Sequence, residues 1–510
     1  METVVAAIDA ATAGGYLLVL ALVLPYAGVF LSLVLGGRYA ERIALALMPA
    51  CLGVAIAIAA IVLQSGKALV YFVGGWAPPL GVALRADGLS AAMLMTAAVV
   101  MGATALFARA NFRQQRELPE ARAPLMFWTL FQGVWGALNA VFIGGDLFNL
   151  YVALELLTFS AVPMVCLDGR AETLAAALRY LLFALMGSLL YLLGVALIYG
   201  TYGTLDIVLL SGRVGVEPTA LVAAALMTAG LLAKTALFPL HLWLPPAHAG
   251  APPAASTVLS ALVIKASFFI VLRLWFDVMP GAMNQAAAQV LAALGSVAIL
   301  FGSVLALRQA RLKLLIAYST VAQIGYLFLM FPLATGSAWA LTGSSGAFIG
   351  GVLQAISHAC AKAAMFMAAG LMAETLGHDR IAGLGGIARM MPMTTISFGL
   401  AGLSLMGLPP SGGFTAKWLL LMAAIESGQW WWALVVLAGG LLTGGYIFRV
   451  LAQAVTEANE PAVPPLPVPR GREGIVLAVA LCSVLLGLVP ISSLGLLQVG
   501  RFDVLAGSLP

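Results

Sequence analysis

The sequence predicts an all-α polytopic membrane protein with about 14 transmembrane helices. The 510-residue chain is 62% hydrophobic and only 9% charged, with a mean hydropathy of +1.05, whereas soluble domains are typically about 25% charged. Apolar segments of roughly the 20 residues that span a bilayer recur along the whole chain. Basic residues concentrate in alternate loops between these segments, as they do in membrane proteins of fixed orientation.

The apolar segments define the expected helices, and a run with five prolines between Glu460 and Arg470 reads as a short linker before the last of them. No soluble domain is expected. In chain order the segments cover roughly residues 15–36, 42–64, 89–108, 124–143, 146–167, 173–199, 219–244, 254–276, 286–307, 312–333, 347–373, 391–425, 429–453 and 474–493.

The distribution of basic residues predicts the orientation. Odd-numbered loops hold 15 of the 25 Lys and Arg residues, while even-numbered loops and the tail hold 5. The excess places odd loops in the cytoplasm and both termini outside. The remaining basic residues lie inside expected helices, where Arg179 is close enough to a helix end to extend its charge to the interface. These residues are Arg179, Lys234, Lys265, Lys362 and Lys417.

The stretch from Leu231 to Lys265 combines a helix breaker with intramembrane charge. Lys234 precedes Pro239, which removes a backbone donor and must kink or break the helix. Lys265 lies near the middle of the next apolar segment, where a lysine costs roughly 2.5–3.5 kcal/mol on insertion scales. Broken helices at membrane depth are tolerated where they line a cavity, and in transporters they lie at ion sites. Two histidines, His241 and His248, follow the break.

Further polar groups lie at membrane depth in other segments. Glu155 is central in the fifth segment, and Lys417 follows a second breaker formed by residues 409–413. His358 and Lys362 are four residues apart and therefore share a helix face. Together with the lysines above, these residues are what a proton relay through lipid requires. A polar stripe on the tenth segment adds Ser319, Gln323 and Tyr326.

Each of these residues also has a purely structural interpretation. A buried lysine can be the partner of one carboxylate or of helix-end carbonyls, and the two histidines can satisfy backbone groups freed by the break. Six ionisable residues at mid-membrane on five different helices nevertheless favour a transport pathway over packing alone.

Other function classes lack their motifs. The chain has no phosphate-binding G-x-x-x-x-G-K-[ST] loop and no haem, iron–sulfur or flavin pattern. Its four cysteines show no metal-ligand spacing, and no basic cluster is interleaved with aromatics as in nucleic-acid binding. We therefore expect no cofactor, no bound metal and no nucleic-acid partner, so that any redox chemistry would belong to a partner subunit.

Five ordered motifs resemble the proton-translocating antiporter superfamily over roughly residues 70–450. This superfamily contains the D and A subunits of Mrp-type cation/proton antiporters, antiporter-like membrane subunits of respiratory complex I, and their relatives in membrane-bound hydrogenases. The motifs are GDLFNLYVALELLTFSAVPMV, LLAKTALFPLHLWLPPAHAGAPPAASTVLSALVIKAS, RLKLLIAYSTVAQIGY, SHACAKAAMFMAAG and GLPPSGGFTAKW.

The resemblance implies 14 helices that contain two inverted five-helix repeats, with helices 7 and 12 broken. The implied division is helices 1–3 in residues 1–110, the first repeat (helices 4–8) in 111–280, the second repeat (helices 9–13) in 281–455, and the linker with helix 14 in 456–510. It also implies that Glu155 pairs with Lys234 and that Lys265 links the two halves. The relay then continues through His358, Lys362 and the terminal Lys417, with His241, His248, Ser319 and Gln323 as a secondary polar path.

The function implied is that of a proton-translocating membrane subunit of a multi-subunit Mrp-type antiporter in a bacterial-type inner membrane, exchanging H⁺ for Na⁺ or K⁺ together with other membrane subunits. The alternative is a proton-pumping subunit of a complex I-like NADH:quinone oxidoreductase or a membrane-bound hydrogenase. A third class, a structural subunit that conducts nothing, is disfavoured because Glu155 and Lys234 are both present.

Overall fold

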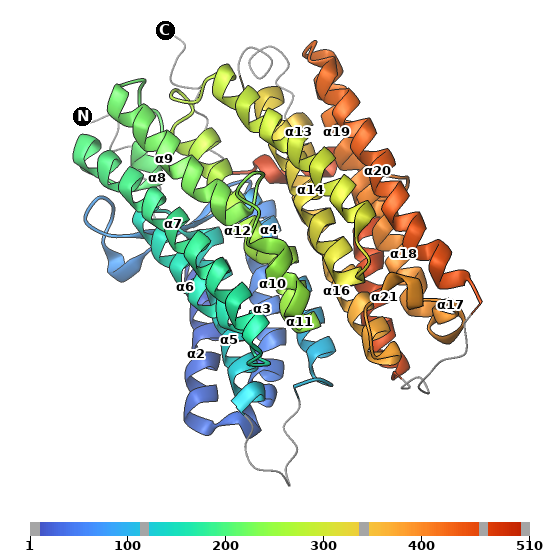
Figure 1. The fold of residues 1–510 in the computed structure, drawn as a ribbon. Helices are drawn as coiled ribbons and strands as arrows, with labels where there is room; N and C mark the ends of the chain where they lie inside the picture. Colours follow the sequence, from blue (N-terminus) through green and yellow to red (C-terminus); the bar gives the residue numbers. More distant parts are fainter. Residues whose placement is uncertain (1–10, 113–121, 336–345, 458–467, 501–510) are drawn as a thin grey trace.

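The computed structural model describes residues 11–112, 122–335, 346–457 and 468–500. Arg113, Arg116 and most of the expected linker lie outside these residues. Figure 1 shows a helical bundle in which the early helices, drawn in blue to green, pack on one side and the late helices, drawn in yellow to red, on the other.

Within the described residues, thirteen helices are long and apolar enough to cross a membrane. A further span is divided into α18 (Pro392–Met406) and α19 (Gly412–Glu426), neither of which is long enough alone. The expected all-α fold with 14 spans is therefore confirmed, as thirteen helices and one broken span. The thirteen are α2 (Tyr16–Leu35), α3 (Gly37–Ser65), α4 (Gly88–Ala108), α5 (Arg122–Ile143), α6 (Leu147–Val165), α7 (Ala171–Tyr202), α9 (Pro218–Thr235), the helix Pro253–Val278, α13 (Gln285–Arg308), α14 (Leu312–Ala334), α16 (Gly346–Leu376), α20 (Trp430–Val455) and α21 with η5 (Arg470–Leu488).

Short elements connect these spans. Two strands pair antiparallel between α3 and α4, with Leu69 opposite Ala86. The short elements are these two strands, three α-helical segments and three 3₁₀ segments. They are β1 (Leu69–Phe72), η1 (Val73–Gly75), β2 (Ala83–Ala86), α8 (Ile207–Leu210), α10 (Leu244–Gly250), η4 (Ile381–Gly383), α17 (Ile387–Met390) and η6 (Ile491–Gln498).

Both ends of the described chain lie against the β1–β2 hairpin. The backbone N–H of Thr12 donates to Val70 O at 3.0 Å, and the Arg85 guanidinium donates to Gly500 O at 2.8 Å. An even number of spans requires the two ends to share one side of the membrane, so this contact agrees with 14 spans.

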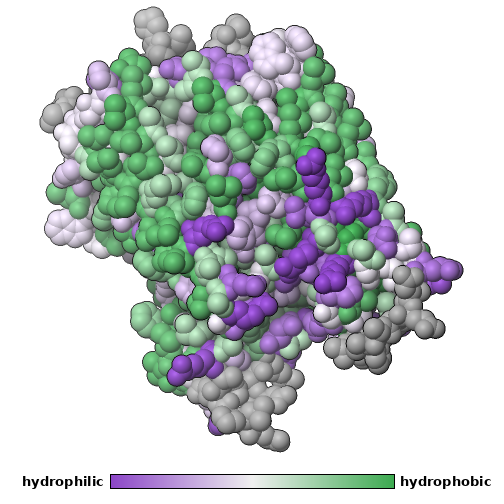
Figure 2. Space-filling model, viewed as in Figure 1, coloured by the Kyte–Doolittle hydropathy of each residue, from purple (hydrophilic) through white to green (hydrophobic). Residues whose placement is uncertain are grey.

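The loops segregate onto two ends of the bundle. At one end, short bridges join the even-numbered loops, Leu84 with Gly144 and Asp146 with Asp206. At the other end, ion pairs join odd-numbered loops and adjacent helix ends. Figure 2 shows hydrophilic residues gathered over the lower part of the visible face, below a mainly hydrophobic upper band. The ion pairs are Arg109–Glu41, Arg311–Asp379 and Arg472–Glu374.

The first helix break begins earlier than expected. α9 ends at Thr235, and Ala236 adopts a left-handed conformation with φ of 59°, so the helix stops before Pro239. α10 then begins at Leu244. The Trp243 indole donates to Ala233 O at 3.0 Å, which satisfies a carbonyl at the interrupted end.

The second break matches the expected position. α18 ends at Met406, Gly407 follows with φ of 85°, and α19 starts at Gly412. A Cβ on Gly407 would lie 2.8 Å from the Cδ of Lys417. Glycine is therefore needed here both for the left-handed conformation and for the close approach of the lysine side chain.

Close packing of α7 on α9 sets the geometry beside the first break. A Cβ on Gly230 would lie 2.2 Å from Gly187 O, and one on Gly187 would lie 2.5 Å from Gly230 O. Small residues let transmembrane helices approach this closely. The contact brings Ser188 and Lys234 alongside Glu155.

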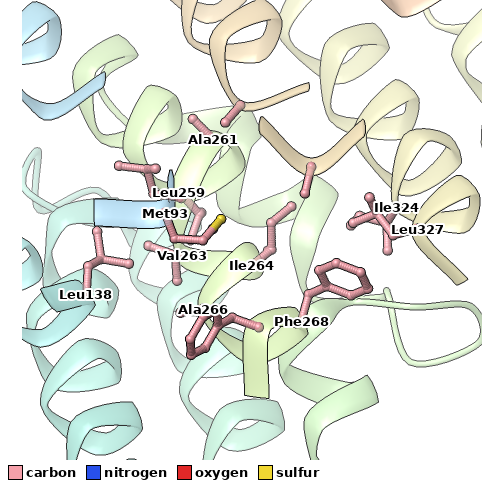
Figure 3. Packing of buried hydrophobic residues seen from close by; sticks show 14 of the residues in the cluster. Met93, Leu138, Leu259, Ala261, Val263, Ile264, Ala266, Phe268, Ile324 and Leu327 are labelled. Carbon is pink, nitrogen blue, oxygen red and sulfur yellow. The ribbon is translucent and has the colours of Figure 1, made fainter. Parts of the chain in front are cut away.

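The eighth span is fully buried and contains two π-helical segments. α11 (Pro253–Val258) continues through η2 (Leu259–Val263), α12 (Ile264–Arg273) and η3 (Leu274–Val278). Figure 3 shows its side chains reaching in two directions, Val263 toward Leu138 and Phe268 toward Leu327. Such π-bulges interrupt the regular hydrogen-bond ladder and are frequent at functional sites.

Candidate functional site

Glu155 on α6 and Lys234 on α9 form an ion pair beside the first break. Lys234 Nζ lies 3.0 Å from Glu155 Oε1, and the two side chains are 6% and 14% exposed. The lysine also donates to Thr158 Oγ1 at 2.9 Å, and the Ser188 hydroxyl donates to the same carboxylate oxygen. Because the pair is sheltered from water, its attraction is screened far less than that of a surface pair.

A small pocket of about 10 Å³ separates this ion pair from the central eighth span. It is lined by Lys234 and Thr158 on one side and by Val263 and Ser267 on the other. A volume of this size is close to the minimum that holds one water molecule. One water could therefore lie between Lys234 and the helix that carries Lys265.

Lys265 is fully buried and donates to a neutral backbone oxygen. Its Nζ donates to Ser260 O at 2.5 Å. Ser260 lies in the π-helical segment η2, and its hydroxyl is 2.9 Å from Thr320 Oγ1 on α14. The bulge thus presents a backbone carbonyl to the lysine and connects the helix to α14 through two hydroxyls.

Lys362 on α16 is bound to the polar stripe of α14. Its Nζ donates to Ile316 O at 3.0 Å and to the Ser319 hydroxyl. The side chain is fully buried. The structure thereby brings Lys362 and Ser319, both candidates from the sequence, into direct contact.

Lys417 is held at the second break by carbonyl oxygens and an aromatic ring. Its Nζ donates to Leu405 O at 2.5 Å and lies 4.1 Å from the centre of the Tyr326 ring. Gln323 donates to the same Leu405 O at 3.2 Å, and Gln354 donates to Gln323 Oε1 at 3.0 Å. A shared carbonyl therefore connects the end of the α14 stripe with Lys417.

His358 and His248 are buried among these lysines without hydrogen bonds. Both ring nitrogens of each histidine lack a partner within the described residues. His358 lies within electrostatic reach of Lys265, Lys362 and Lys417, and His248 lies within reach of Lys265 and Lys362. Both therefore lie in the central part of the buried polar line that runs from Glu155 and Lys234 through Lys265 and Lys362 to Lys417, which we call the axis.

His241 lies apart from the axis. Its ring centre is 5.4 Å from that of Phe238 and 5.4 Å from that of Phe301. It borders a groove together with Arg179 and Tyr318. The structure does not bring His241 into contact with any of the candidate relay residues.

The family described as NADH:quinone oxidoreductase/Mrp antiporter, TM matches residues 144–443, a range that includes every residue of the axis. The chain belongs to this family. It is 36% identical over 396 residues to NADH-quinone oxidoreductase subunit N of Desulforudis audaxviator, covering 77% of this chain and 76% of that protein. It is 29% identical to the D subunit of the Na(+)/H(+) antiporter of Alkalihalophilus pseudofirmus, covering 76% of each chain.

The fold of the family is also found in a solved assembly. A chain in the structure of the Mrp complex from Dietzia sp. superposes with a TM-score of 0.85 and covers 97% of this chain and 98% of its own length, at 24% sequence identity. The expected superfamily and fold are both confirmed.

One buried charge cluster of this family member was not expected. Arg273 is buried and donates to Asp87 at 2.6 and 2.7 Å and to Asp277 at 2.8 Å. Burial alone would raise the pKa of Asp87, but the charge and hydrogen bonds of Arg273 outweigh it and lower that pKa to about 2. The signal available in the sequence was Arg273 and Asp277 four residues apart, which places them on one helix face.

Proposed function

We propose that this chain conducts protons along the buried axis from Glu155 to Lys417. One observation carries the proposal, namely that six ionisable side chains from five spans converge on one polar line within an apolar bundle. Burying them is costly and is not explained by packing alone. The line begins at the Glu155–Lys234 pair, passes Lys265, His358 and Lys362, and ends at Lys417.

Proton transfer requires donors and acceptors within hydrogen-bond reach, directly or through one water. Glu155 and Lys234 meet this condition directly. The pocket beside Lys234 offers space for a water toward the eighth span, and hydroxyl, amide and carbonyl groups accompany Lys362 and Lys417. The histidines supply ring nitrogens, which can accept or donate a hydrogen bond.

Within the family, we propose that the chain works in a multi-subunit Mrp-type antiporter, exchanging H⁺ for Na⁺ or K⁺. The support is the 29% identity to the D subunit of an Na(+)/H(+) antiporter over three quarters of both chains. With no nucleotide or redox motif in the sequence, the energy for uphill transport would come from an ion gradient.

A second candidate is a proton-pumping subunit of a complex I-like NADH:quinone oxidoreductase. The 36% identity to NADH-quinone oxidoreductase subunit N favours it. The two assemblies differ in their other members, so affinity purification of the tagged chain from its native membrane separates them. Small membrane subunits alone support the antiporter, whereas co-purifying soluble iron–sulfur subunits support the redox complex.

Reconstitution in liposomes tests conduction itself. The purified chain alone should show little cation-dependent proton movement, and flux should rise when the co-purified subunits are added. Robust Na⁺- or K⁺-coupled exchange by the lone chain would overturn the proposal that it depends on partners. Absence of proton flux in the complete assembly would overturn conduction through this axis.

The proposed orientation places both ends of the chain on the outer face of a bacterial-type inner membrane. A single cysteine introduced in place of Thr12 should react with an impermeant thiol reagent in intact cells, whereas one introduced in place of Arg170 should react only after the membrane is opened. The reverse labelling pattern would reject this orientation. The background should carry serine at the four native cysteines.

A further inference from the structure

A groove of about 310 Å³, lined by both polar and apolar side chains, opens on the side of the bundle between α7, the first helix break and α14. Leu242 in its lining is 57% exposed, and Leu178 and Leu182, the chain neighbours of the lining residues Arg179 and Phe183, are 56% and 60% exposed. These leucines lie in or beside membrane spans. The groove therefore faces the surroundings of the bundle and lies apart from the central axis.

Arg179 provides an unpaired positive charge at this groove. It lies within the span α7, is exposed, and makes no hydrogen bond or ion pair with any described residue. Arg170 and Arg311 at the same end of the bundle each have an aspartate partner. Because no described residue neutralises this guanidinium, a negative group from outside the chain would stabilise Arg179.

Two further polar groups face the same space. His241 lines the groove and is 3% exposed. Its ring is held between Phe238 and Phe301, which fixes its position beside the groove. The half-buried Tyr318 contributes a phenol hydroxyl that makes no hydrogen bond to a described residue.

The depth of Arg179 corresponds to the headgroup level of a bilayer. α7 has 32 residues, so it is about 48 Å long and exceeds the roughly 30 Å hydrocarbon core. Arg179 is about 12 Å from the first residue of the helix. Helical side chains tilt toward the N-terminus, so the guanidinium reaches toward the odd-loop end and the interface.

We propose that this groove binds the phosphate of an anionic phospholipid. Arg179 donates charge-assisted hydrogen bonds to the phosphate oxygens, a geometry for which guanidinium is well suited. Tyr318 and the imidazole of His241 donate to the same group. The acyl chains lie along the exposed leucines Leu178 and Leu182, which a free phosphate ion could not use.

The occupied groove would also support the first break. His241 belongs to the irregular segment between α9 and α10, while Arg179 and Tyr318 belong to two different long helices. A phosphate bound to all three therefore fixes the break against α7 and α14. Lipid binding would in this way stabilise the segment that follows Lys234.

Native mass spectrometry of the full chain in mild detergent tests the assignment, with phosphatidylglycerol as the probe and phosphatidylcholine as the neutral comparison. We expect R179Q to bind phosphatidylglycerol about tenfold more weakly, as for a lost charge-assisted hydrogen bond, and Y318F about threefold more weakly. R179K should retain most of the affinity. The matched control is R308Q, which removes an exposed charge from the same end of the bundle but outside the groove.

Three outcomes would overturn the proposal. An equal loss of phosphatidylglycerol binding in R179Q and R308Q would mean that only the net charge of the protein determines lipid binding. Displacement of the lipid by millimolar inorganic phosphate would indicate a free-anion site. Crosslinking of a cysteine at Leu242 to a partner subunit in native membranes would show that a protein helix occupies the groove. Each outcome is independent of whether the axis conducts protons, because none of these residues lies in it.

Discussion

The two helix breaks hold their lysines in different electrostatic surroundings. At the first break, Lys234 faces the carboxylate of Glu155 at 3.0 Å. At the second, Lys417 is held by Leu405 O at 2.5 Å and by the face of the Tyr326 ring. A carboxylate carries a full charge that disappears on protonation, whereas a carbonyl or a ring contributes a fixed dipole or quadrupole.

We propose that this difference gives the two halves different tasks. The attraction at the first break can be switched by moving one proton, so Glu155 and Lys234 form a coupled pair whose state can respond to neighbouring charges. The second break offers its lysine nearly constant surroundings. The protonation state of Lys417 should then follow the protons delivered along α14 and α16, as expected of a terminal donor or acceptor.

The strongest test of this contrast removes one member of the first pair. In E155A or K234A the remaining charge is buried and unpaired, which costs about 3–5 kcal/mol in buried ion pairs. We expect proton flux in the complete assembly to fall about 100-fold or more. Flux is measured with a pH-sensitive dye in proteoliposomes.

The control for that experiment is E426A, which removes an exposed carboxylate at the end of α19 and should leave flux unchanged. Both axis variants should still assemble with their partners on a gel-filtration column. Near-normal flux in either of them would exclude the pair as the switch and make the two breaks equivalent.

The second test addresses the terminal lysine. K417A removes the group that exchanges protons, and K417R retains a charge that arginine hardly releases in proteins. Both should stop flux, although no carboxylate faces this site among the described residues. If K417R transported at the wild-type rate, Lys417 would be an electrostatic support and not a proton carrier.

A smaller effect is expected for the amide that shares a carbonyl with Lys417. Q323L keeps the volume but removes the donor to Leu405 O and the acceptor of Gln354. The lost hydrogen bonds are worth about 1 kcal/mol each, so flux should fall several-fold without vanishing. S296A, whose hydroxyl bonds only to its own helix, serves as the control and should not change flux. A Q323L rate equal to that of S296A would remove Gln323 from the pathway.

The sequence was sufficient for the features that local chemistry determines. Pro409 and Gly412 locate the second break, and the intramembrane lysines identify the main candidates without coordinates. Pro239 indicates the first break, although the helix already ends at Thr235. The π-helical segment at Ser260 was not predictable, because its apolar sequence contains no helix breaker. The contact of Arg273 with Asp87 joins residues 186 positions apart, and only the tertiary fold brings them together.

Asp206 lies outside the membrane spans, and it allows the effect on stability of burying a carboxylate without an ion pair among the described residues to be measured. Burial raises the pKa of Asp206 to about 6, although Leu209 N–H donates to it. Its second oxygen has no hydrogen-bond partner within the described residues. Since this pKa is raised, Asp206 stabilises the fold below about pH 4, and that contribution is lost as pH rises through 6.

D206N should therefore be more stable than the wild type at pH 8, by roughly 2–3 kcal/mol, because the folded pKa lies about two above the unfolded one. Asparagine keeps the helix-capping acceptor, so the difference should shrink toward zero as the pH falls below about 4. Thermal unfolding of the purified wild-type and D206N chains across this pH range measures the difference in stability. D87N provides the contrasting control, because it removes the partner of Arg273 and should be less stable than the wild type at pH 8. If D206N were less stable than the wild type at pH 8, the ionised carboxylate of Asp206 would have a stabilising partner. Asp206 and Asp87 would then both behave as paired carboxylates.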